Sequence, residues 1–291
     1  MKCPPFDPKN AKSGSSSASV TRPHYIGSRY ADFAAGLLTL NAGYNDEILI
    51  ANLRRLRGEV DKFLLRSASR IAGTPALPAP KAQIIFLLSN YHSILLRLRS
   101  AGFHDSDDAQ YWSAQSKIQI DLYVEEELRD KFKDLVRFVM ANPVQVNPVE
   151  LKKFVDEYAG RTAYWKEGIE SINASVARNF AAASAAAGEE AAAMAAAAQA
   201  KKTGAAAAPG SRTSQGLGGP SVAAAAAASS SSSGGASGSF HMDIFMEVLS
   251  QLILYHRRFQ SLVEKHLERK DAQKLVSNQE IMIEIKKISK H

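Results

Sequence analysis

The stretch RPHYIGSRYADFAAGLLTLN, residues 22–41, introduces a pattern that the rest of the chain repeats. Its large apolar residues recur at steps of four, three, four and three, and they are Ile26, Tyr30, Phe33, Leu37 and Leu40. This spacing puts them on one stripe of an α-helix, so we expect a helix that packs against neighbouring helices. Pro23 has no N–H to lose and a φ suited to a first helical turn, so the helix should begin within a few residues of it.

Two further helices are expected in the amino-terminal part of the chain. One covers residues 46–71, with Asn45 or Asp46 as its N-cap, and the other covers residues 81–101, with Gly102 as its C-cap. The apolar stripe of the first is Leu49, Leu53, Leu56, Val60, Phe63 and Leu64. That of the second is Ile84, Leu87, Leu88, Tyr91, Ile94, Leu95 and Leu98. The second stripe is wide, which predicts burial on more than one side.

A fourth helix is predicted to run unbroken over residues 105–140, and Asn142-Pro143 should close it. Its expected stripe is Trp112, Ile118, Leu122, Leu128, Phe132, Leu135 and Val139. The three acids that it carries at residues 125–127 are expected to form a solvated face.

A fifth helix is predicted from Asn147, an N-cap residue followed by proline at the first helical position and Glu150 at the third. Its expected stripe is Leu151, Phe154, Val155, Tyr158, Trp165, Ile169, Ile172, Val176 and Phe180. Gly160 and Gly168 each weaken the helix by roughly 1 kcal/mol relative to alanine, so we expect a bend there.

Residues 181–239 consist largely of Ala, Ser and Gly, and we predict a disordered, flexible insertion. The alanines up to residue 200 also favour a continuation of the fifth helix. A sixth helix should follow from Phe240, and Ser277 with Glu280 forms a capping box for a short last helix. The predicted organisation is a disordered tail (1–21), a helical part (22–180), the insertion (181–239) and closing helices (240–291). The closing helices carry apolar stripes, so they should return to the helices that precede the insertion.

The composition limits the possible settings of this 291-residue chain. Its single cysteine, Cys3, allows no intrachain disulfide, so a cytosolic face is expected. No apolar run approaches the ~20 residues that cross a bilayer, and the first twenty residues lack the apolar core of a signal peptide. Any membrane association is therefore expected to be peripheral.

Basic residues are concentrated near the amino terminus, where residues 1–104 hold fourteen Lys and Arg against six acids. Six of them lie in the helix expected over residues 46–71. A helix with this many basic residues can contact anionic lipid headgroups or nucleic acid, or form a solvated basic face. No aromatic or glycine pattern of a nucleic-acid module accompanies it, which favours the solvated face, and no nucleic acid is expected. The candidate partner or membrane contacts are Arg54, Arg55, Arg57, Arg66 and Arg70, with Arg257 and Arg258 on the flank of the sixth helix.

No motif of a known catalytic or metal centre occurs in the sequence. Phosphate loops of the GxxxxGK type, GxGxxG, HExxH and GxSxG are all absent. We therefore predict no catalytic residues, no cofactor and no metal, and a surface-presenting protein ahead of an enzyme of unknown motif. Tyr91-His92 and Tyr255-His256 could form proton relays, although side chains at helix–helix seams are the favoured interpretation.

Four runs of sequence carry a resemblance to a known family, in the same order as in that family. They are RPHYIGSRYADF from Arg22, IIFLLSNYHSIL from Ile84, LSQLILYHRRF from Leu249 and IMIEIKKISKH from Ile281. These runs resemble the carboxy-terminal half of the vacuolar protein sorting subunit fifty-two family, a component of the GARP tethering complex.

The resemblance implies an all-α fold, an elongated rod of stacked antiparallel helical bundles with about six to seven helices. It implies a non-enzymatic tethering subunit in retrograde transport from endosomes to the trans-Golgi network, peripheral on the cytosolic face of those membranes. Other tether subunits, a Rab-type GTPase and SNARE proteins are the implied partners. The family's amino-terminal coiled-coil half has no counterpart in this sequence, so the chain is expected to correspond to a fragment of such a subunit. A basic helical module that binds anionic membrane directly stays open as the alternative.

Overall fold

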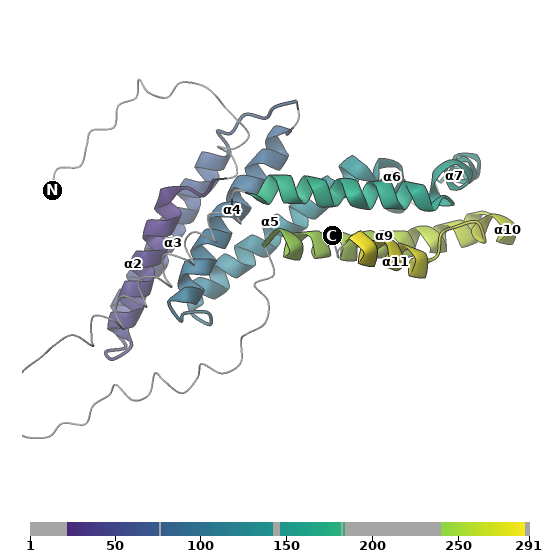
Figure 1. Ribbon diagram of the computed structural model, residues 1–291. Coiled ribbons are helices and arrows are strands. Elements are labelled where there is room, and N and C mark those ends of the chain that lie inside the picture. The colour runs from purple at the N-terminus through teal and green to yellow at the C-terminus, as the bar shows by residue number, and fades with distance from the viewer. Residues whose placement is uncertain (1–21, 76, 142–145, 182, 184–239, 289–291) are drawn as a thin grey trace, which may run out of the picture.

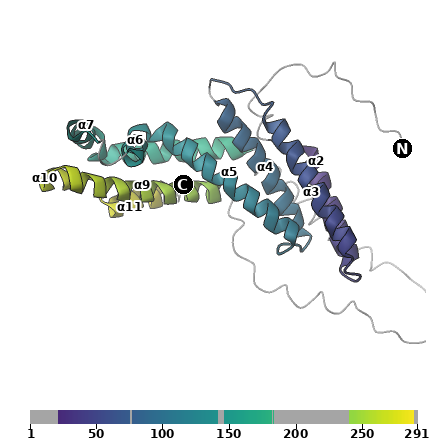
Figure 2. The ribbon, with the colours of Figure 1, turned by 180° about the vertical axis from the view of Figure 1, so that it is seen from behind.

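The computed structural model describes residues 22–75, 77–141, 146–181, 183 and 240–288 (Figure 1). Within these ranges the regular structure is helical, apart from one isolated β-bridge between Thr74 and Leu77. The helices form two bundles that meet at an angle, and α5 runs from one bundle into the other (Figures 1 and 2). The prediction of an all-α fold of packed bundles is confirmed.

The first bundle consists of α2 (Tyr25–Asn41), α3 (Glu47–Ala68), α4 (Ala79–Ser100) and the beginning of α5 (Asp107–Lys131). The helix ends in this bundle lie within three residues of the predicted ones. The His24 side chain caps α2, and Asp46 Oδ1 caps α3 by accepting from Ile48 N at 2.8 Å. Gly102 follows α4 with φ +89°, a conformation that residues with a side chain rarely adopt.

Helix α4 belongs to both bundles. Tyr91 and Leu98 lie in the core of the first bundle, whereas Ile85 and Leu88 lie in the core of the second. All seven residues of its predicted stripe are buried, which confirms the predicted burial on more than one side. A tightly buried ion pair between Lys81 Nζ and Glu127 Oε2 joins α4 to α5 at 2.5 Å. Glu127 is fully buried, so the prediction of a solvated acidic face is wrong at this position.

The predicted fourth helix is in fact two helices, α5 and α6 (Lys133–Met140). Phe132 separates them with φ −124° and ψ 42°, outside the helical region. Its ring is fully buried and stacks on Trp165, with ring centroids 5.6 Å apart. The break between α5 and α6 thus occurs where Phe132 packs on Trp165, and helical periodicity alone does not reveal it. Ile118 and Leu122, both on the predicted stripe of α5, are also about half exposed.

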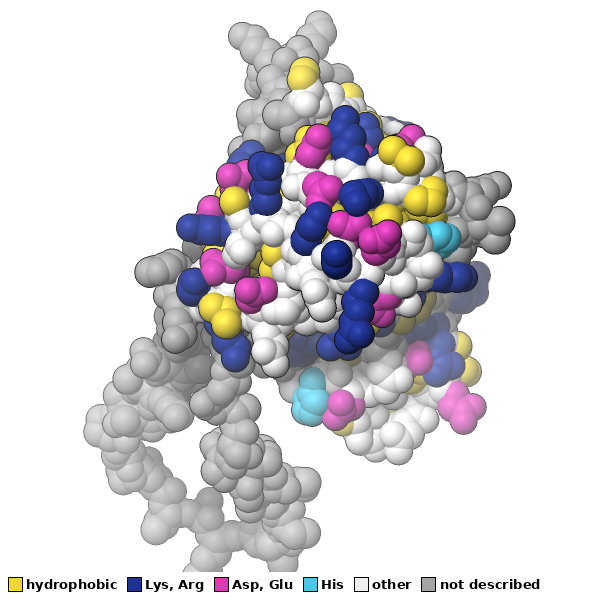
Figure 3. All heavy atoms as spheres, turned by 90° about the vertical axis from the view of Figure 1, so that its right-hand side faces the viewer, with side chains coloured by type: hydrophobic (Ala, Val, Ile, Leu, Met, Phe, Trp, Pro, Cys, Tyr) yellow, Lys and Arg dark blue, Asp and Glu magenta, His cyan; other side chains and the backbone are white. Residues whose placement is uncertain are grey.

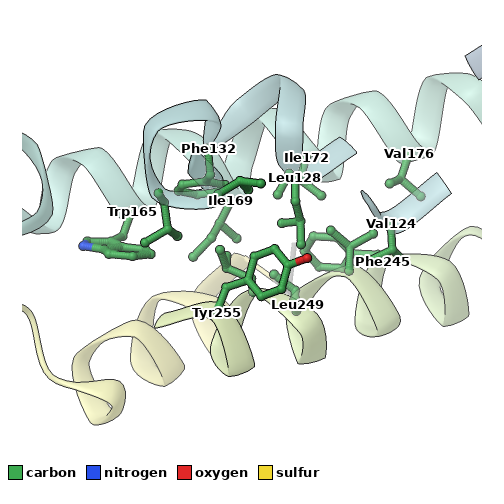
Figure 4. Packing of buried hydrophobic residues seen from close by; sticks show 14 of the residues in the cluster. Val124, Leu128, Phe132, Trp165, Ile169, Ile172, Val176, Phe245, Leu249 and Tyr255 are labelled. Carbon is green, nitrogen blue, oxygen red and sulfur yellow. The ribbon is translucent and has the colours of Figure 1, made fainter. Parts of the chain in front are cut away.

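The second bundle contains the end of α5, α6, a helix over residues 162–181, and α9 (Phe240–His266). Asn147 caps α7 (Pro148–Phe154), as predicted, and the π-helical turn η3 (Val155–Ala159) follows it. The chain bends after Gly160 but passes Gly168 without a break, so the predicted bend at Gly168 is wrong. Side chains of residues 162–181 and of α9 face one another in the core, among them Ile169, Phe245 and Leu249 (Figure 4).

The closing helices return to the preceding helices, as the sequence predicts. Phe259 of α9 is fully buried between the rings of Phe138 and Phe154, whereas Arg257 and Arg258 are exposed. Helices α10 (Arg269–Ala272) and α11 (Asn278–Ile288) follow. The predicted capping box starts α11, since Ser277 N donates to Glu280 Oε2 and Glu280 N donates to Ser277 Oγ. The predicted tail and most of the predicted insertion lie outside the described residues.

Candidate partner-binding surface

An open apolar groove lies between α2 and α3 on the outside of the first bundle. It has a volume of about 510 Å³, and its lining residues are Phe33, Leu37, Asp46, Ile48, Leu49, Asn52, Leu53 and Leu56. Two of the lining side chains are more than half exposed, Phe33 at 53% and Ile48 at 74%, and Leu40, seven residues after Phe33 on α2, is 68% exposed. Contiguous exposed apolar surface of this kind is typical of interaction sites.

The prediction that Phe33 and Leu40 face the core is wrong, because α2 buries a different face. The buried face carries Gly27, Tyr30, Ala31 and Ala34, whose small members allow α2 to approach α4 closely. A Cβ atom on Gly27 would already lie 3.4 Å from Ile94 Cδ1. The larger apolar side chains of α2 are therefore left on the groove side.

Helix α3 carries two apolar stripes. Leu53, Val60 and Leu64 are buried in the first bundle. Leu49, Leu56 and Phe63 are spaced by seven residues and form a second stripe. Leu49 and Leu56 line the groove, whereas the Phe63 ring lies beyond it, 5.2 Å from the His24 ring, and Leu56 and Phe63 are more than a third exposed. The sequence analysis merged both stripes into one core face, and that prediction is wrong for Leu56 and Phe63. A helix with two such stripes has the pattern of one that packs between two neighbours.

A partly buried polar network links α3 to α2 and α5. Arg57 Nη1 lies 2.9 Å from Asp107 Oδ2 and 3.2 Å from Asp108 Oδ1. The Tyr30 hydroxyl donates to Asp108 Oδ1 at 2.6 Å, which links α2 to the same carboxylate. Burial, together with the hydrogen bond to Asp108, raises the pKa of Tyr30 far above its ordinary value. Hydrogen bonds from Arg54 and then Arg57 hold the pKa of Asp107 below its usual range.

A second polar centre lies at Asp61, on the buried side of α3. The hydroxyls of Tyr91 and Tyr111 donate to its two carboxylate oxygens, each at 2.7 Å. Partial burial and the bond to Asp61 raise the pKa of Tyr111 to about 12. Sequence reasoning missed both polar centres. The only available signal was the occurrence of Asp61 and Arg57 on the buried side of the α3 pattern.

The basic residues predicted as contacts fall into two groups. Arg57 and Arg54 form ion pairs within the fold: Arg57 pairs with Asp107 and Asp108, and Arg54 Nε lies 3.0 Å from Asp107 Oδ2. The other predicted contacts on or just after α3, Arg55, Arg66 and Arg70, are exposed. Arg257 and Arg258 are exposed on α9, in the other bundle. The structure therefore does not bring the seven arginines together into one site.

The two tyrosine–histidine pairs are built into helix seams. His92 stacks on Phe240, with ring centroids 3.7 Å apart, and burial lowers the pKa of His92 to about 4. His256 is fully buried, with Nδ1 2.7 Å from Asn278 Oδ1, and burial lowers its pKa as well. Both histidines thus join α9 to its neighbours, in agreement with the favoured interpretation.

The far end of the second bundle, formed by α7 and α10, has a different surface. Positive and negative side chains alternate there (Figure 3). Lys274 Nζ lies 2.7 Å from Asp156 Oδ1 and 2.8 Å from Asp271 Oδ1, and Lys152 Nζ lies 2.9 Å from Asp271 Oδ2. These pairs tie α10, and Lys274 just after it, to α7 and η3, so these charges at the far end are paired with one another.

Among the described residues, no group of three or more His, Cys, Asp or Glu side chains is arranged to hold a metal ion. None of the helices in the described part of the chain combines the length and hydropathy that a membrane span needs.

The groove lies in a part of the chain that resembles a known family. Residues 6–124 match the family described as Vps52, C-terminal, and this range includes α2, α3 and α4. Vacuolar protein sorting-associated protein 52 A of Arabidopsis thaliana is 33% identical over 168 residues, which are 55% of this chain and 22% of that protein. The vacuolar protein sorting-associated protein 52 homolog of Homo sapiens is 29% identical over 167 residues, again 55% of this chain and 22% of the relative.

The match thus spans less than a quarter of the length of these relatives. No solved structure is significantly similar to the chain. The family match and the curated relatives agree with each other, and the matched range includes the first two of the four runs, those from Arg22 and Ile84. Over the matched part of the chain, these comparisons support the Vps52 family, through the C-terminal region of that family.

Proposed function

We propose that this chain is part of a non-enzymatic subunit of a multisubunit vesicle-tethering complex, and that the α2–α3 groove is one of its protein-binding surfaces. The observation that carries the proposal is the exposed apolar groove within the segment that matches the family. Large apolar side chains exposed side by side, such as Phe33 and Ile48, lower the solubility of a protein unless a partner covers them.

The finer assignment follows from the family. We propose a GARP-like complex that acts in retrograde transport from endosomes to the trans-Golgi network, on the cytosolic face of those membranes. The partners would be the other subunits of the tether, with a Rab-type GTPase and SNARE proteins as further ligands. The helical bundles would supply rigid surfaces for these contacts, and no cofactor or catalytic centre would be needed.

Affinity purification tests this proposal. The tagged chain is recovered from cytosol at moderate salt, and co-purifying proteins are identified by mass spectrometry. The expected result is recovery of other subunits of one tethering complex in constant ratio to the chain. Recovery of the chain without any such subunit, or a saturable nucleotide or ester turnover that a point substitution abolishes, would overturn the proposal.

A further inference from the structure

We infer that the α2–α3 groove binds one amphipathic α-helix of a protein partner, and that acidic residues flank the apolar stripe of that helix. The inference rests on the proposed function, because it specifies the chemistry of a partner at the same surface. It commits to a helix with acidic edges, rather than to a lipid bilayer or to a second copy of this chain.

The shape of the groove favours a helix. Two antiparallel helices, α2 and α3, form its walls, and Leu53, which is 2% exposed, lies at its floor. The seven-residue spacing of Leu49, Leu56 and Phe63 is the spacing at which one helix packs its side chains between those of another. A third helix laid along this groove would complete a layer of the kind found in helical bundles.

A row of basic residues borders the groove on its α3 side. Arg55, Lys62 and Arg66 follow one another at steps of seven and four, so they share a face next to the stripe of Leu56 and Phe63. Glu59 lies among them and bonds to Lys62, at 2.8 Å from Lys62 Nζ. This edge of the groove therefore carries three basic side chains and one acidic side chain, Glu59.

Positive charge also occurs on the α2 side. Arg29 precedes Phe33 by one helical turn and Leu40 by three, so it continues the same exposed line. The acid that lines the groove, Asp46, uses its carboxylate to cap α3. Acidic residues on both edges of the partner helix would therefore meet exposed arginines, namely Arg29 on one edge and Arg55 and Arg66 on the other, and basic residues there would be repelled.

A bilayer fits this surface less well than a helix does. The floor residue Leu53 is buried, and Leu56 is only 38% exposed, so a flat surface cannot reach the apolar side chains inside the groove. Asn52 and Asp46 in the lining would also have to leave water for hydrocarbon, which is costly without hydrogen-bond partners.

Two synthetic peptides of about 21 residues, or three heptads, test whether the groove binds an apolar helical stripe and whether it prefers acidic residues beside that stripe. Both carry leucine at the two core positions of each heptad; one has glutamate at the flanking positions and the other has lysine. Binding to the whole chain is measured by fluorescence anisotropy. The expected result is that the glutamate peptide binds at least about tenfold more tightly, and that added salt reduces this preference.

Three variants assign the binding to the groove. Ile48→Glu, at a side chain that is mostly exposed, should weaken the glutamate peptide by about tenfold or more without a change in the thermal transition. The double variant Arg55→Glu with Arg66→Glu should reverse the preference between the two peptides. The matched control, Arg257→Glu with Arg258→Glu on α9, should bind as the unaltered chain does.

Equal affinity for both peptides, binding of neither, or a preference that survives Arg55→Glu with Arg66→Glu would overturn the inference. Flotation of the chain with phosphatidylserine vesicles, lost in the Ile48→Glu variant, would also overturn it by assigning the groove to a membrane surface. These failures are distinct from failure of the proposed function. A chain that co-purifies with tether subunits but ignores both peptides keeps the function and loses only this account of the groove.

Discussion

Phe180 and Phe240, on either side of the Ala/Ser/Gly-rich segment, pack edge to face with their ring centroids 5.5 Å apart. Both rings belong to the core of the second bundle. The two ends of the segment are therefore close in space, and the helices on each side are held by contacts that do not depend on it.

We predict that residues 184–239 can be replaced by a short Gly-Ser linker with little change in stability. The segment holds few large apolar residues, and the entropy cost of loop closure grows only logarithmically with loop length. A thermal melt of the deletion variant should show one cooperative transition at or slightly above that of the full chain. Loss of the cooperative transition would show that the segment contributes to folding.

The second prediction concerns Gly168, against which the ring of Phe132 lies. A Cβ atom at position 168 would lie 2.8 Å from Phe132 Cε1 and closer still to Cζ. Gly168→Ala should therefore destabilise the protein by about 1–3 kcal/mol, despite the better helix propensity of alanine. The matched control is Gly58→Ala in α3, where no atom lies within 4 Å of the new Cβ, and this change should stabilise by about 0.5–1 kcal/mol. Urea melts of both variants that shift in the same direction would contradict this account.

The third prediction compares two neighbours on α9. Phe259 is fully buried, so Phe259→Ala should cost on the order of 3–5 kcal/mol of unfolding free energy. Arg257 is exposed, so Arg257→Ala should stay within about 0.5 kcal/mol. Guanidinium melts that gave the reverse order would mean that the other face of α9 meets the core.

The fourth prediction concerns acid stability. Burial lowers the pKa of His92 to about 4 from an ordinary value of 6.5, so the folded state binds a proton less readily than the unfolded state. The stability that the protein has with His92 neutral is therefore fully present above pH 6.5. As the pH falls from 6.5 towards 4, the unfolding free energy decreases by up to about 3 kcal/mol because of this group. The positive charge of Arg99 also lowers the pKa of His92, and Arg99 lines the same pocket together with Lys117, Asp243 and Glu247.

His92→Phe isolates the histidine, because the substitution keeps a ring against Phe240 and removes the titrating group. As the pH falls from 6.5 to 4, the unfolding free energy of the unaltered protein should fall relative to that of the variant. If both proteins lose stability in parallel over this range, His92 is not the cause of the acid sensitivity.

The existence and order of the helices could be predicted from the sequence because their signals are local. The caps at Asp46 and Asn147, the glycine at position 102 and the capping box at Ser277 each act within a few residues of the chain. The direction that a helix faces was harder to predict. On α2 the small residues face inward and Phe33 faces outward, a choice that depends on how closely α4 approaches.

The sequence predicts neither the break at Phe132 nor the groove, because both depend on contacts between residues that are far apart along the chain. Phe132 leaves the helical region where its ring meets Trp165 and Gly168, far along the chain. Likewise, Leu56 and Phe63 continue a regular apolar pattern, and only the three-dimensional arrangement shows that this pattern splits into a core stripe and an exposed stripe. Periodicity identifies an apolar face but not the neighbour that covers it.

Photo-crosslinking from the groove tests the central claim most directly. Benzoylphenylalanine replaces Leu56 in the tagged chain, the chain is purified from cytosol with its partners, and the irradiated products are mapped by mass spectrometry. We predict crosslinks to one helical segment of another tether subunit, with acidic residues beside its apolar stripe, and none to that segment from a probe at the exposed residue Ile283 of α11. Crosslinks from position 56 to lipid, to a second copy of this chain or to the same peptides as from position 283 would contradict the account.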